Sequence, residues 1–238
     1  MIAVPTNASL HILFDLLAWG SAALLGVWLY RWRLHEAAGI ATRTGPYYVV
    51  ALAIGAVAGA WGFGSWNTAL SAVPHPSHSI AGALAGAIVA VELYKLARGI
   101  KGSTGAIWVG PLALGIAVGR LGCLFAGLGD ETYGVPTGLP WAVDLGDGVP
   151  RHPVQLYESA AMLAFLAVYL AALARRAAWT RGRAFYLFIL FYAAQRFAWE
   201  FLKPYPRLLG PLDIFQLLGL AMMAYALWFD GHARRARP

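Results

Sequence analysis

Five ionisable side chains interrupt long apolar stretches of this chain: Asp15, Arg120, Glu158, Arg196 and Glu200. Ionisable groups are costly in such surroundings and usually mark a functional site. Arg196 and Glu200 are one helical turn apart, so they could also form a structural ion pair with no further role. An arginine guanidinium, however, binds phosphate through a planar fork of donors. Two arginines among three carboxylates therefore favour a site for a phosphorylated headgroup.

Histidine and cysteine side chains offer a second kind of chemistry. His152 follows a basic residue and could act as a general base near neutral pH. His75 and His78 could do the same, or could be loop residues without a role. Cys123, three residues after Arg120, could be a nucleophile, although a cysteine in an apolar helix is more often an inert packing residue. These three histidines lack the spacing of metal ligands, so we expect no metal and no cofactor.

The apolar stretches predict the elements that position these side chains. The chain has 238 residues, of which 60% are hydrophobic and 12% are charged, whereas soluble proteins average roughly 25% charged residues. A run of about 20 apolar residues is long enough to cross a bilayer as a helix. We therefore predict an all-α polytopic membrane protein with a single transmembrane domain over residues 1–238. Its seven predicted spans fall near 10–30, 47–71, 79–97, 105–128, 154–174, 184–203 and 208–229.

Basic residues occur mainly in alternate connections, which predicts the topology. Thirteen of the 18 Lys and Arg residues lie in every second connection and in the C-terminal tail, and the positive-inside rule makes these segments cytoplasmic. The N-terminus is then outside and the C-terminus cytoplasmic. All five ionisable groups named first fall in the outer half of the membrane, and a Gly- and Pro-rich loop at about 129–153 lies outside. Because topology accounts for the net charge of +7, we expect no nucleic-acid partner. The thirteen residues are Arg31, Arg33, Arg43, Lys95, Arg98, Lys101, Arg175, Arg176, Arg181, Arg183, Arg234, Arg235 and Arg237.

Two local spacings predict how the helices pack. Small residues four positions apart let helix backbones approach closely in a membrane, or, as an alternative, shape a lipid-sized cavity. Glu92 precedes Lys95 by three positions, which predicts a helix ion pair whose lysine extends to the cytoplasmic surface. The small-residue pairs are Gly55 and Gly59, Gly82 and Gly86, and Gly115 and Gly119.

Four motifs, in preserved order, resemble the prolipoprotein diacylglyceryl transferase family. Gly119-Arg120-Leu121-Gly122 resembles the start of the family signature, and Glu131-Thr132-Tyr133-Gly134 resembles its Glu-x-x-Gly end. Residues 150–158, Pro-Arg-His-Pro-Val-Gln-Leu-Tyr-Glu, resemble the family's Arg-His-Pro-Ser-Gln-Leu-Tyr-Glu block. Residues 192–201 fit its Tyr-x-x-x-Arg-Phe-x-x-Glu-Phe block. Two shorter matches are Leu139-Pro140-Trp141 and, more weakly, Leu10-His11 in the first helix.

The resemblance implies an activity and a set of site residues. The family moves the diacylglyceryl group of phosphatidylglycerol to the cysteine thiol of a lipoprotein signal peptide at the bacterial plasma (inner) membrane, so phosphatidylglycerol and a lipoprotein precursor are the implied partners. Arg120 and Arg196 would hold the phosphate, and His152 or Glu131 would assist proton transfer, which makes these four the implied catalytic residues. The implied substrate-binding residues are Arg151, Gln155, Tyr157, Glu158, Tyr192 and Glu200.

The sequence also departs from the family pattern, which keeps other functions open. Cys123 and Ala126 stand where the signature has asparagines, and Ala81 stands where the family has a histidine, for which His78 could substitute. An enzyme of the same fold that transfers a phospholipid-derived group to another acceptor is therefore an alternative. A non-catalytic lipid-binding protein is a second alternative. A small transporter fits less well, because the predicted spans lack charge near the midplane.

Overall fold

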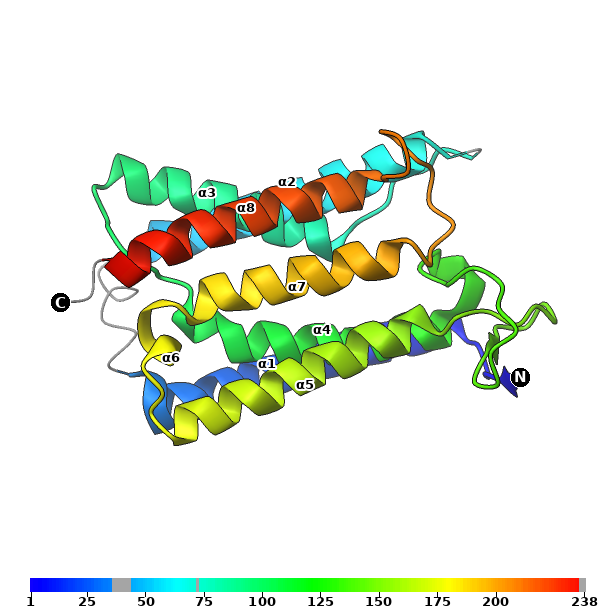
Figure 1. Ribbon diagram of the computed structural model, residues 1–238, viewed down its shortest axis with the longest axis horizontal. Helices are drawn as coiled ribbons and strands as arrows, with labels where there is room; N and C mark the ends of the chain where they lie inside the picture. The colour runs from blue at the N-terminus through cyan, green and yellow to red at the C-terminus, as the bar shows by residue number, and fades with distance from the viewer. Residues whose placement is uncertain (36–43, 72, 236–238) are drawn as a thin grey trace. The chain divides into compact units, whose positions relative to one another are not determined.

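The computed structural model describes residues 1–35, 44–71 and 73–235 (Figure 1), so Arg43 and Arg237 of the predicted cytoplasmic set lie outside the described residues. The chain forms two compact units. Unit 1 comprises Met1–His35, Ala106–Ala184 and Phe201–Pro204, and unit 2 comprises Glu36–Gly105, Phe185–Glu200 and Tyr205–Pro238. The prediction of a single domain stays a prediction.

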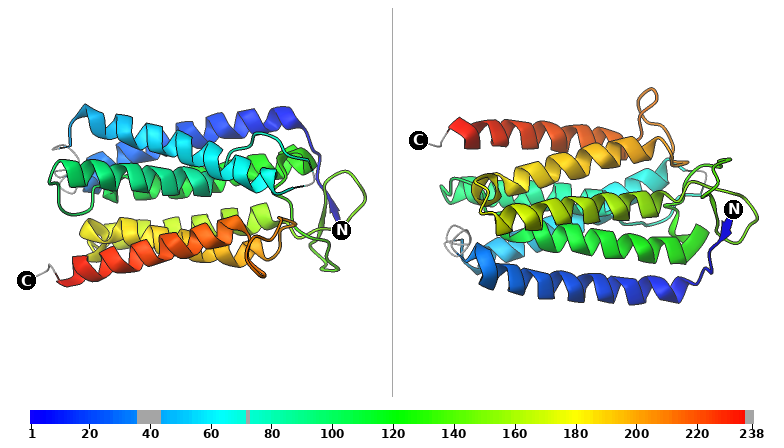
Figure 2. Two further views of the ribbon diagram at one scale, coloured as in Figure 1. Left: turned by 90° about the horizontal axis from the view of Figure 1, so that it is seen from above. Right: turned by 60° about the horizontal axis from the view of Figure 1, so that its bottom comes forward.

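Unit 1 contains three long helices: α1 (Ala8–Leu29), α4 (Val109–Ala126) and α5 (Val154–Ala174). Helix α4 packs against both α1 and α5, and the three run alongside one another in Figure 1 and in the right-hand view of Figure 2. The side-chain oxygen of Asn7 accepts a hydrogen bond from the Ser9 amide and caps the start of α1. Four short helices complete the unit: η1 (Tyr30–Leu34), η4 (Ala106–Trp108), η5 (Gly127–Asp130) and α6 (Trp179–Gly182).

The start of unit 1 forms a short two-stranded sheet, which is a departure from the predicted all-α fold. Strand β1 (Ile2–Ala3) pairs in parallel with β2 (Val143–Asp144), with Ile2 opposite Val143. The amide of Asn7 also donates to the carbonyl of Phe125 at 2.8 Å. Extended segments expose backbone groups that need partners, and these bonds supply them. The chain that enters α1 is thereby tied both to the end of α4 and to the outer loop.

The predicted outer loop begins and ends close to the predicted positions, since η5 ends at Asp130 and α5 begins at Val154. Backbone hydrogen bonds hold it in place. Arg151 and Val143 exchange amide–carbonyl bonds of 2.9 and 3.0 Å, and His152 donates to the carbonyl of Val135 at 3.1 Å. The loop therefore has a defined backbone path despite its Gly and Pro content.

Unit 2 contains α2 (Pro46–Ala69), α3 (Ile80–Ala97), α7 (Ala184–Glu200, whose first residue belongs to unit 1) and α8 (Ile214–Arg235). Helices α2 and α3 meet at their glycines. A Cβ added at Gly59 would lie 2.2 Å from the carbonyl oxygen of Gly82, and one at Gly86 would lie 2.1 Å from that of Gly55. No side chain fits there, so the prediction of close helix packing is confirmed for these two pairs. Gly115 and Gly119 do not make such a contact.

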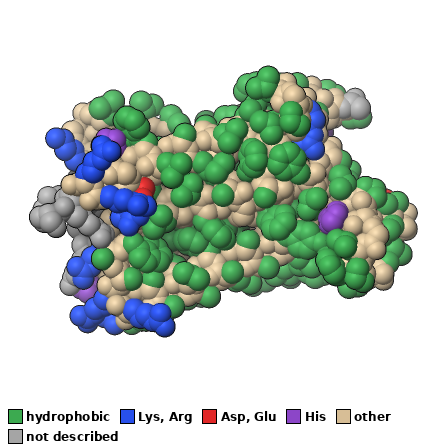
Figure 3. Space-filling view, viewed as in Figure 1, with side chains coloured by type: hydrophobic (Ala, Val, Ile, Leu, Met, Phe, Trp, Pro, Cys, Tyr) green, Lys and Arg blue, Asp and Glu red, His purple; other side chains and the backbone are tan. Residues whose placement is uncertain are grey.

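The helices have the length and surface that membrane spans need. Among the described residues, six helical segments are long and apolar enough to cross a bilayer: Ser9–Leu34, Pro46–Ala69, Ile80–Ala97, Ala106–Asp130, Val154–Ala174 and Ile214–Arg235. Helix α7, of 17 residues, coincides with the remaining predicted block. Hydrophobic side chains cover the helices in the space-filling view (Figure 3), and exposed residues of this kind include Trp19, Leu24, Val57, Leu96 and Val168. A surface of large exposed apolar side chains is suited to lipid rather than water.

Candidate active site

A buried ion cluster in unit 1 contains two of the predicted site residues. The Nε atom of Arg120 lies 2.6 Å from Oε2 of Glu158, and Nζ of Lys203 lies 2.8 Å from Oε1 of the same carboxylate. The three side chains are 7%, 1% and 0% exposed, respectively. Charges removed from water are tolerated only when they stay paired, so this cluster fixes the rotamers of all three groups. Lys203 was missed by the sequence analysis.

Gln155 lies one turn before Glu158 on α5, and its side chain is fully buried. Its Nε2 donates to Oγ1 of Thr132 at 3.5 Å, and that hydroxyl donates to Oδ2 of Asp130 at 2.5 Å. The Oε1 atom of Gln155 has no hydrogen-bond partner among the described residues. Buried amide oxygens normally have one. Gln155 is therefore an acceptor that a ligand donor could satisfy, in keeping with its predicted substrate-binding role.

Glu131, a predicted proton-transfer residue, is exposed at the start of the outer loop. Its backbone φ is +55°, a left-handed conformation that few residues other than glycine adopt. The left-handed turn directs the chain from η5 into the loop. The structure therefore places Glu131 at the loop entrance and Asp130, its neighbour, in the hydrogen-bonded cluster with Thr132.

Arg151 is held by a carboxylate within the loop. Its Nη1 and Nη2 atoms lie 2.6 and 2.8 Å from the two carboxylate oxygens of Asp147. These hydrogen bonds lower the pKa of Asp147 and raise the pKa of Arg151, as expected for a bidentate pair. The guanidinium carbon of Arg151 also lies 5.2 Å from the ring centre of Tyr133. The pair is a brace across the loop, and the substrate-binding role predicted for Arg151 stays a prediction.

His152 and Tyr157, both predicted site residues, lie next to each other. The Nδ1 atom of His152 is 3.5 Å from the hydroxyl oxygen of Tyr157, which accepts a hydrogen bond of 2.8 Å from Nε1 of Trp141. The indole donation leaves the Tyr157 proton available to an acceptor such as the imidazole. A candidate base and a candidate headgroup-binding hydroxyl are thus brought together at the start of α5.

A further polar cluster in unit 1 was not predicted. The imidazole of His11, in the first turns of α1, lies between Asp15, Cys123 and Asp130. Cys123 is in turn 3.8 Å from Nη1 of Arg120. The sequence singled out Asp15 and Cys123 separately, and Leu10-His11 as a weak family match, but nothing in it indicated that these side chains meet.

In unit 2, Arg196 and Glu200 form the ion pair that their spacing predicted. Nε of Arg196 lies 2.5 Å from Oε1 of Glu200, and the two side chains are 3% and 0% exposed. The guanidinium carbon also lies 5.4 Å from the ring centre of Phe215 on α8. Tyr192, one turn earlier on α7, is buried as well. The pair is therefore a fixed interior group rather than a surface salt bridge.

The two arginines predicted to share a phosphate thus belong to different units, Arg120 to unit 1 and Arg196 to unit 2. Each has a buried carboxylate partner within its own unit. Their joint action on one ligand stays a prediction.

The start of α8 in unit 2 contains a reciprocal cap that the sequence analysis missed. The Gln216 amide donates to Oδ1 of Asp213 at 2.8 Å, and the Asp213 amide donates to Oε1 of Gln216 at 3.0 Å. This arrangement satisfies two backbone donors that a helix start leaves without partners. Arg207 adds a contact of 3.2 Å to the Asp213 carboxylate. The cap fixes the segment that follows Arg196 and Glu200 in the chain.

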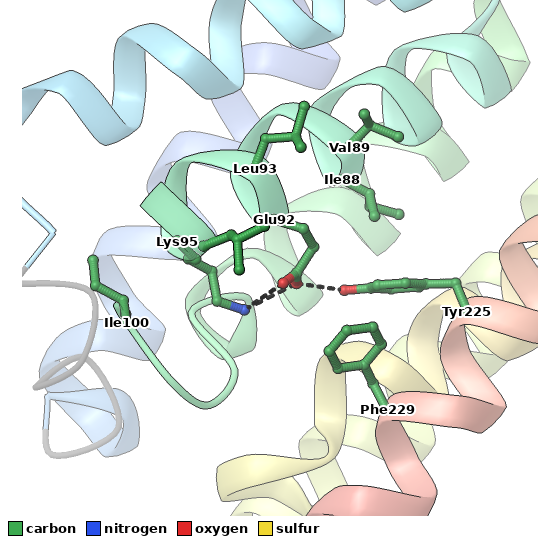
Figure 4. A pocket seen from close by; sticks show the side chains of 9 residues that line it. Ile88, Val89, Glu92, Leu93, Lys95, Ile100, Tyr225 and Phe229 are labelled. Atoms are coloured by element: carbon green, nitrogen blue, oxygen red, sulfur yellow. Dashed lines mark hydrogen bonds and ion pairs between the residues drawn. The ribbon is translucent and has the colours of Figure 1, made fainter. Parts of the chain in front are cut away.

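A cavity of about 450 Å³ lies between α3 and α8 of unit 2, away from the predicted site residues of that unit (Figure 4). Glu92 projects into it and accepts hydrogen bonds of 2.9 Å from Lys95 and 2.8 Å from the hydroxyl of Tyr225. The ion pair was predicted correctly, but its predicted extension to the surface was wrong. The Lys95 side chain is only 5% exposed, because Glu92 and the packing of α3 on α8 hold it inside.

The Tyr225→Phe variant should therefore weaken this unit without affecting any predicted site residue. Loss of a hydrogen bond to a charged group is expected to lower the free energy of unfolding by roughly 1–3 kcal/mol. Detergent-induced unfolding in mixed micelles measures the change. Tyr47→Phe, which removes an exposed hydroxyl, is the matched control and should be neutral. Equal stability of both variants would contradict the interior role of the Glu92 pair.

Fold and site together define a polytopic helical membrane protein with buried, carboxylate-paired arginines and a polar loop between Asp130 and Val154. The family model described as prolipoprotein diacylglyceryl transferase matches residues 16–230. The chain belongs to the prolipoprotein diacylglyceryl transferase family.

Curated relatives agree with this placement. Phosphatidylglycerol–prolipoprotein diacylglyceryl transferase from Geobacter sulfurreducens is 38% identical over 48% of this chain and 45% of its own length. The protein of that name from Bordetella parapertussis is 36% identical over 56% of this chain and 51% of its own length. The protein of that name from Nitratidesulfovibrio vulgaris is 34% identical over 70% of this chain and 64% of its own length. The chain thus spans about half the length of the first two relatives and somewhat more of the third.

Proposed function

We propose that this protein is a transferase that moves the diacylglyceryl group of phosphatidylglycerol to the cysteine thiol of a lipoprotein signal peptide. The observation that carries the proposal is the buried ion pair of Arg120 and Glu158 in unit 1, with the buried Gln155 one turn before Glu158 on α5. These residues come from two motifs of the family that are far apart in sequence, yet they occupy adjoining ends of α4 and α5. The names of the relatives supply the donor and the acceptor.

The proposed topology has seven spans, with the N-terminus outside and the C-terminus cytoplasmic, in the bacterial plasma (inner) membrane. Each of the seven predicted apolar blocks coincides with a helix. Helix α7 is the shortest at 17 residues, or about 25 Å at 1.5 Å per residue. That length is slightly less than a hydrocarbon core of about 30 Å, a mismatch that local thinning of the bilayer accommodates.

The proposed reaction is displacement at a glyceryl carbon. The thiol of the acceptor cysteine gives its proton to a base, and the sulfur forms a bond to that carbon. The carbon–oxygen bond to phosphate breaks, and glycerol phosphate leaves with the electron pair. The leaving phosphate needs cationic donors placed before the reaction begins. Arg120 and Arg196 supply them, and His152 or Glu131 accepts the thiol proton.

The remaining site residues have positioning or binding roles in this proposal. Glu158 and Glu200 each hold one arginine by its Nε atom, which directs the guanidinium without requiring either carboxylate to contact the lipid. Lys203 is a second cation on the Glu158 carboxylate, so these three side chains together carry a net positive charge that suits a phosphate. Gln155, Tyr157, Tyr192 and Arg151 are proposed to bind the polar part of the donor.

A mass assay tests the function. The purified protein in vesicles of phosphatidylglycerol receives a lipoprotein signal peptide that bears its cysteine, and the peptide mass is followed with time. We expect a gain of one diacylglyceryl group. A peptide with serine in place of cysteine and vesicles of phosphatidylethanolamine serve as controls, and neither should react.

Absence of product, while one of the relatives reacts in parallel, would overturn the proposed acceptor or the activity itself. Consumption of phosphatidylglycerol without modified peptide would then indicate a different acceptor, in line with Cys123 and Ala126 in the signature. Saturable binding of phosphatidylglycerol without turnover would indicate a non-catalytic lipid-binding protein.

A further inference from the structure

Three potential metal ligands from separate segments meet at one end of unit 1. They are Nε2 of His11 on α1, Sγ of Cys123 in the last turn of α4, and a carboxylate oxygen of Asp130 at the end of η5. Nε2 lies 3.9 Å from the sulfur and 3.1 Å from Oδ1 of Asp130, and the three ligand atoms all lie within 4.8 Å of one another. The cluster is half-buried.

These separations are close to the distances between ligand atoms in a tetrahedral zinc site. Zn–S bonds of about 2.3 Å and Zn–N and Zn–O bonds of about 2.0 Å at tetrahedral angles place sulfur and nitrogen about 3.5 Å apart, and nitrogen and oxygen about 3.3 Å apart. The observed 3.9 and 3.1 Å differ from these values by a few tenths of an ångström. The third separation, from the sulfur to the Asp130 carboxylate, is at most 4.8 Å, so the ligands draw together when an ion binds.

Neighbouring groups already orient two of the ligands. Oδ2 of Asp15 lies 2.9 Å from Nδ1 of His11. A carboxylate at Nδ1 fixes the tautomer that presents the Nε2 lone pair, which is the usual outer partner of a metal-bound histidine. On the other ligand, the hydroxyl of Thr132 donates to Oδ2 of Asp130 at 2.5 Å and leaves Oδ1 directed at His11.

The helices are also brought together at this point by a residue without a side chain. A Cβ added at Gly122 would lie 2.7 Å from Cβ of Phe14 and 3.5 Å from the carbonyl oxygen of His11. Only glycine allows α4 to approach α1 so closely beside the histidine. The approach places Cys123, the next residue, against the imidazole.

The charges of the cluster suit a dication. A thiolate at Cys123 and the carboxylate of Asp130 would together neutralise two positive charges. The nearest cation, Arg120, lies 3.8 Å from the sulfur but is paired with Glu158 at 2.6 Å.

We propose that His11, Cys123 and Asp130 form a binding site for one Zn²⁺-class cation. Sulfur and imidazole ligands select zinc and similar d-block ions over Mg²⁺ or Ca²⁺. Three protein ligands leave one tetrahedral position for an outside ligand, as in catalytic rather than structural zinc sites. The proposal stands on this geometry and does not depend on the proposed transferase activity.

Cobalt binding tests the site directly. The full chain, carrying an affinity tag without histidines, is freed of metal with a chelator in detergent and titrated with Co²⁺. We expect about one Co²⁺ per chain, tetrahedral absorption bands and a thiolate-to-cobalt charge-transfer band. The charge-transfer band should disappear in Cys123→Ser, and affinity should fall in His11→Gln and Asp130→Asn. His75→Gln, which changes an exposed histidine elsewhere, should bind as the wild type does.

Two further measurements keep the test decisive if a ligand variant misfolds. Cys123 is the only cysteine in the chain, so Zn²⁺ should slow its alkylation in the wild type by about tenfold or more. Asp15→Asn changes a side chain that is 43% exposed and should weaken Co²⁺ binding by about 10- to 100-fold through loss of the His11 orientation. Absence of both the charge-transfer band and the protection would overturn the proposal. Unchanged binding in Cys123→Ser and His11→Gln would do the same, since the ion would then be bound elsewhere.

Discussion

Arg120→Ala is expected to reduce diacylglyceryl transfer about a hundred- to a thousandfold, the usual effect of removing one fixed donor to a developing anion. The variant should still fold, because Glu158 keeps Lys203 as a partner at 2.8 Å. The initial rate of peptide mass gain in phosphatidylglycerol vesicles measures the effect. Arg196→Ala, in unit 2, should give a loss of the same order.

Arg175→Ala is the matched control, because this exposed arginine follows α5 and is not among the predicted site residues. Its rate should equal that of the wild type. Arg120→Lys keeps a positive charge but loses the bidentate fork of donors, so it should recover only part of the activity. Full activity in both Arg120→Ala and Arg196→Ala would rule out the proposed phosphate site.

Glu158→Ala is expected to have the largest effect on stability. It leaves Arg120 and Lys203, which are 7% and 0% exposed, without the carboxylate between them. Removing one partner of a buried ion cluster costs about 3–5 kcal/mol, since the remaining charges stay buried. Unfolding by sodium dodecyl sulfate in mixed micelles measures the loss. Glu158→Gln keeps the shape and two polar atoms, so its effect should be smaller.

Asp147→Ala provides the contrast, since it also removes the carboxylate partner of an arginine but at the exposed surface of the loop. Its unfolding midpoint should move far less than that of Glu158→Ala. If the two variants unfold at the same concentration of detergent, the buried cluster does not have the stabilising role assigned to it.

The sequence predicted the helices well, because apolar length is a local property of the chain. Each predicted apolar block corresponds to a helix, and the glycine spacing of α2 and α3 predicted their close contact. The Arg196–Glu200 pair was predictable for the same reason, since four residues form one helical turn. The β1–β2 pairing was not, because it depends on the register of distant segments.

Which side of a helix faces the protein interior was harder to predict. Helices of this kind are apolar on most sides, so the periodicity that marks the buried face of a soluble helix is weak. The spacing of Glu92 and Lys95 therefore predicted their ion pair but not the burial of the lysine. Lys203 was missed for a related reason, since nothing local marks a lysine after α7 as the partner of Glu158.

The polar cluster around His11 shows the limit of motif spacing. His11 and Cys123 are 112 positions apart, and metal-ligand patterns are recognisable in a sequence only when ligands are close together. The prediction that no metal binds rested on His75, His78 and His152, none of which belongs to this cluster. The contact exists because α1 and α4 pack side by side at Gly122.

The pairing of Ile2 with Val143 has a consequence for how the protein is made. During synthesis and insertion, the first strand must wait until the chain beyond Val143 has emerged before its backbone groups find their final partners. The brace between Asp147 and Arg151 lies just beyond that strand, so this loop reaches its final backbone pairing only after α1 and α4 have both been made.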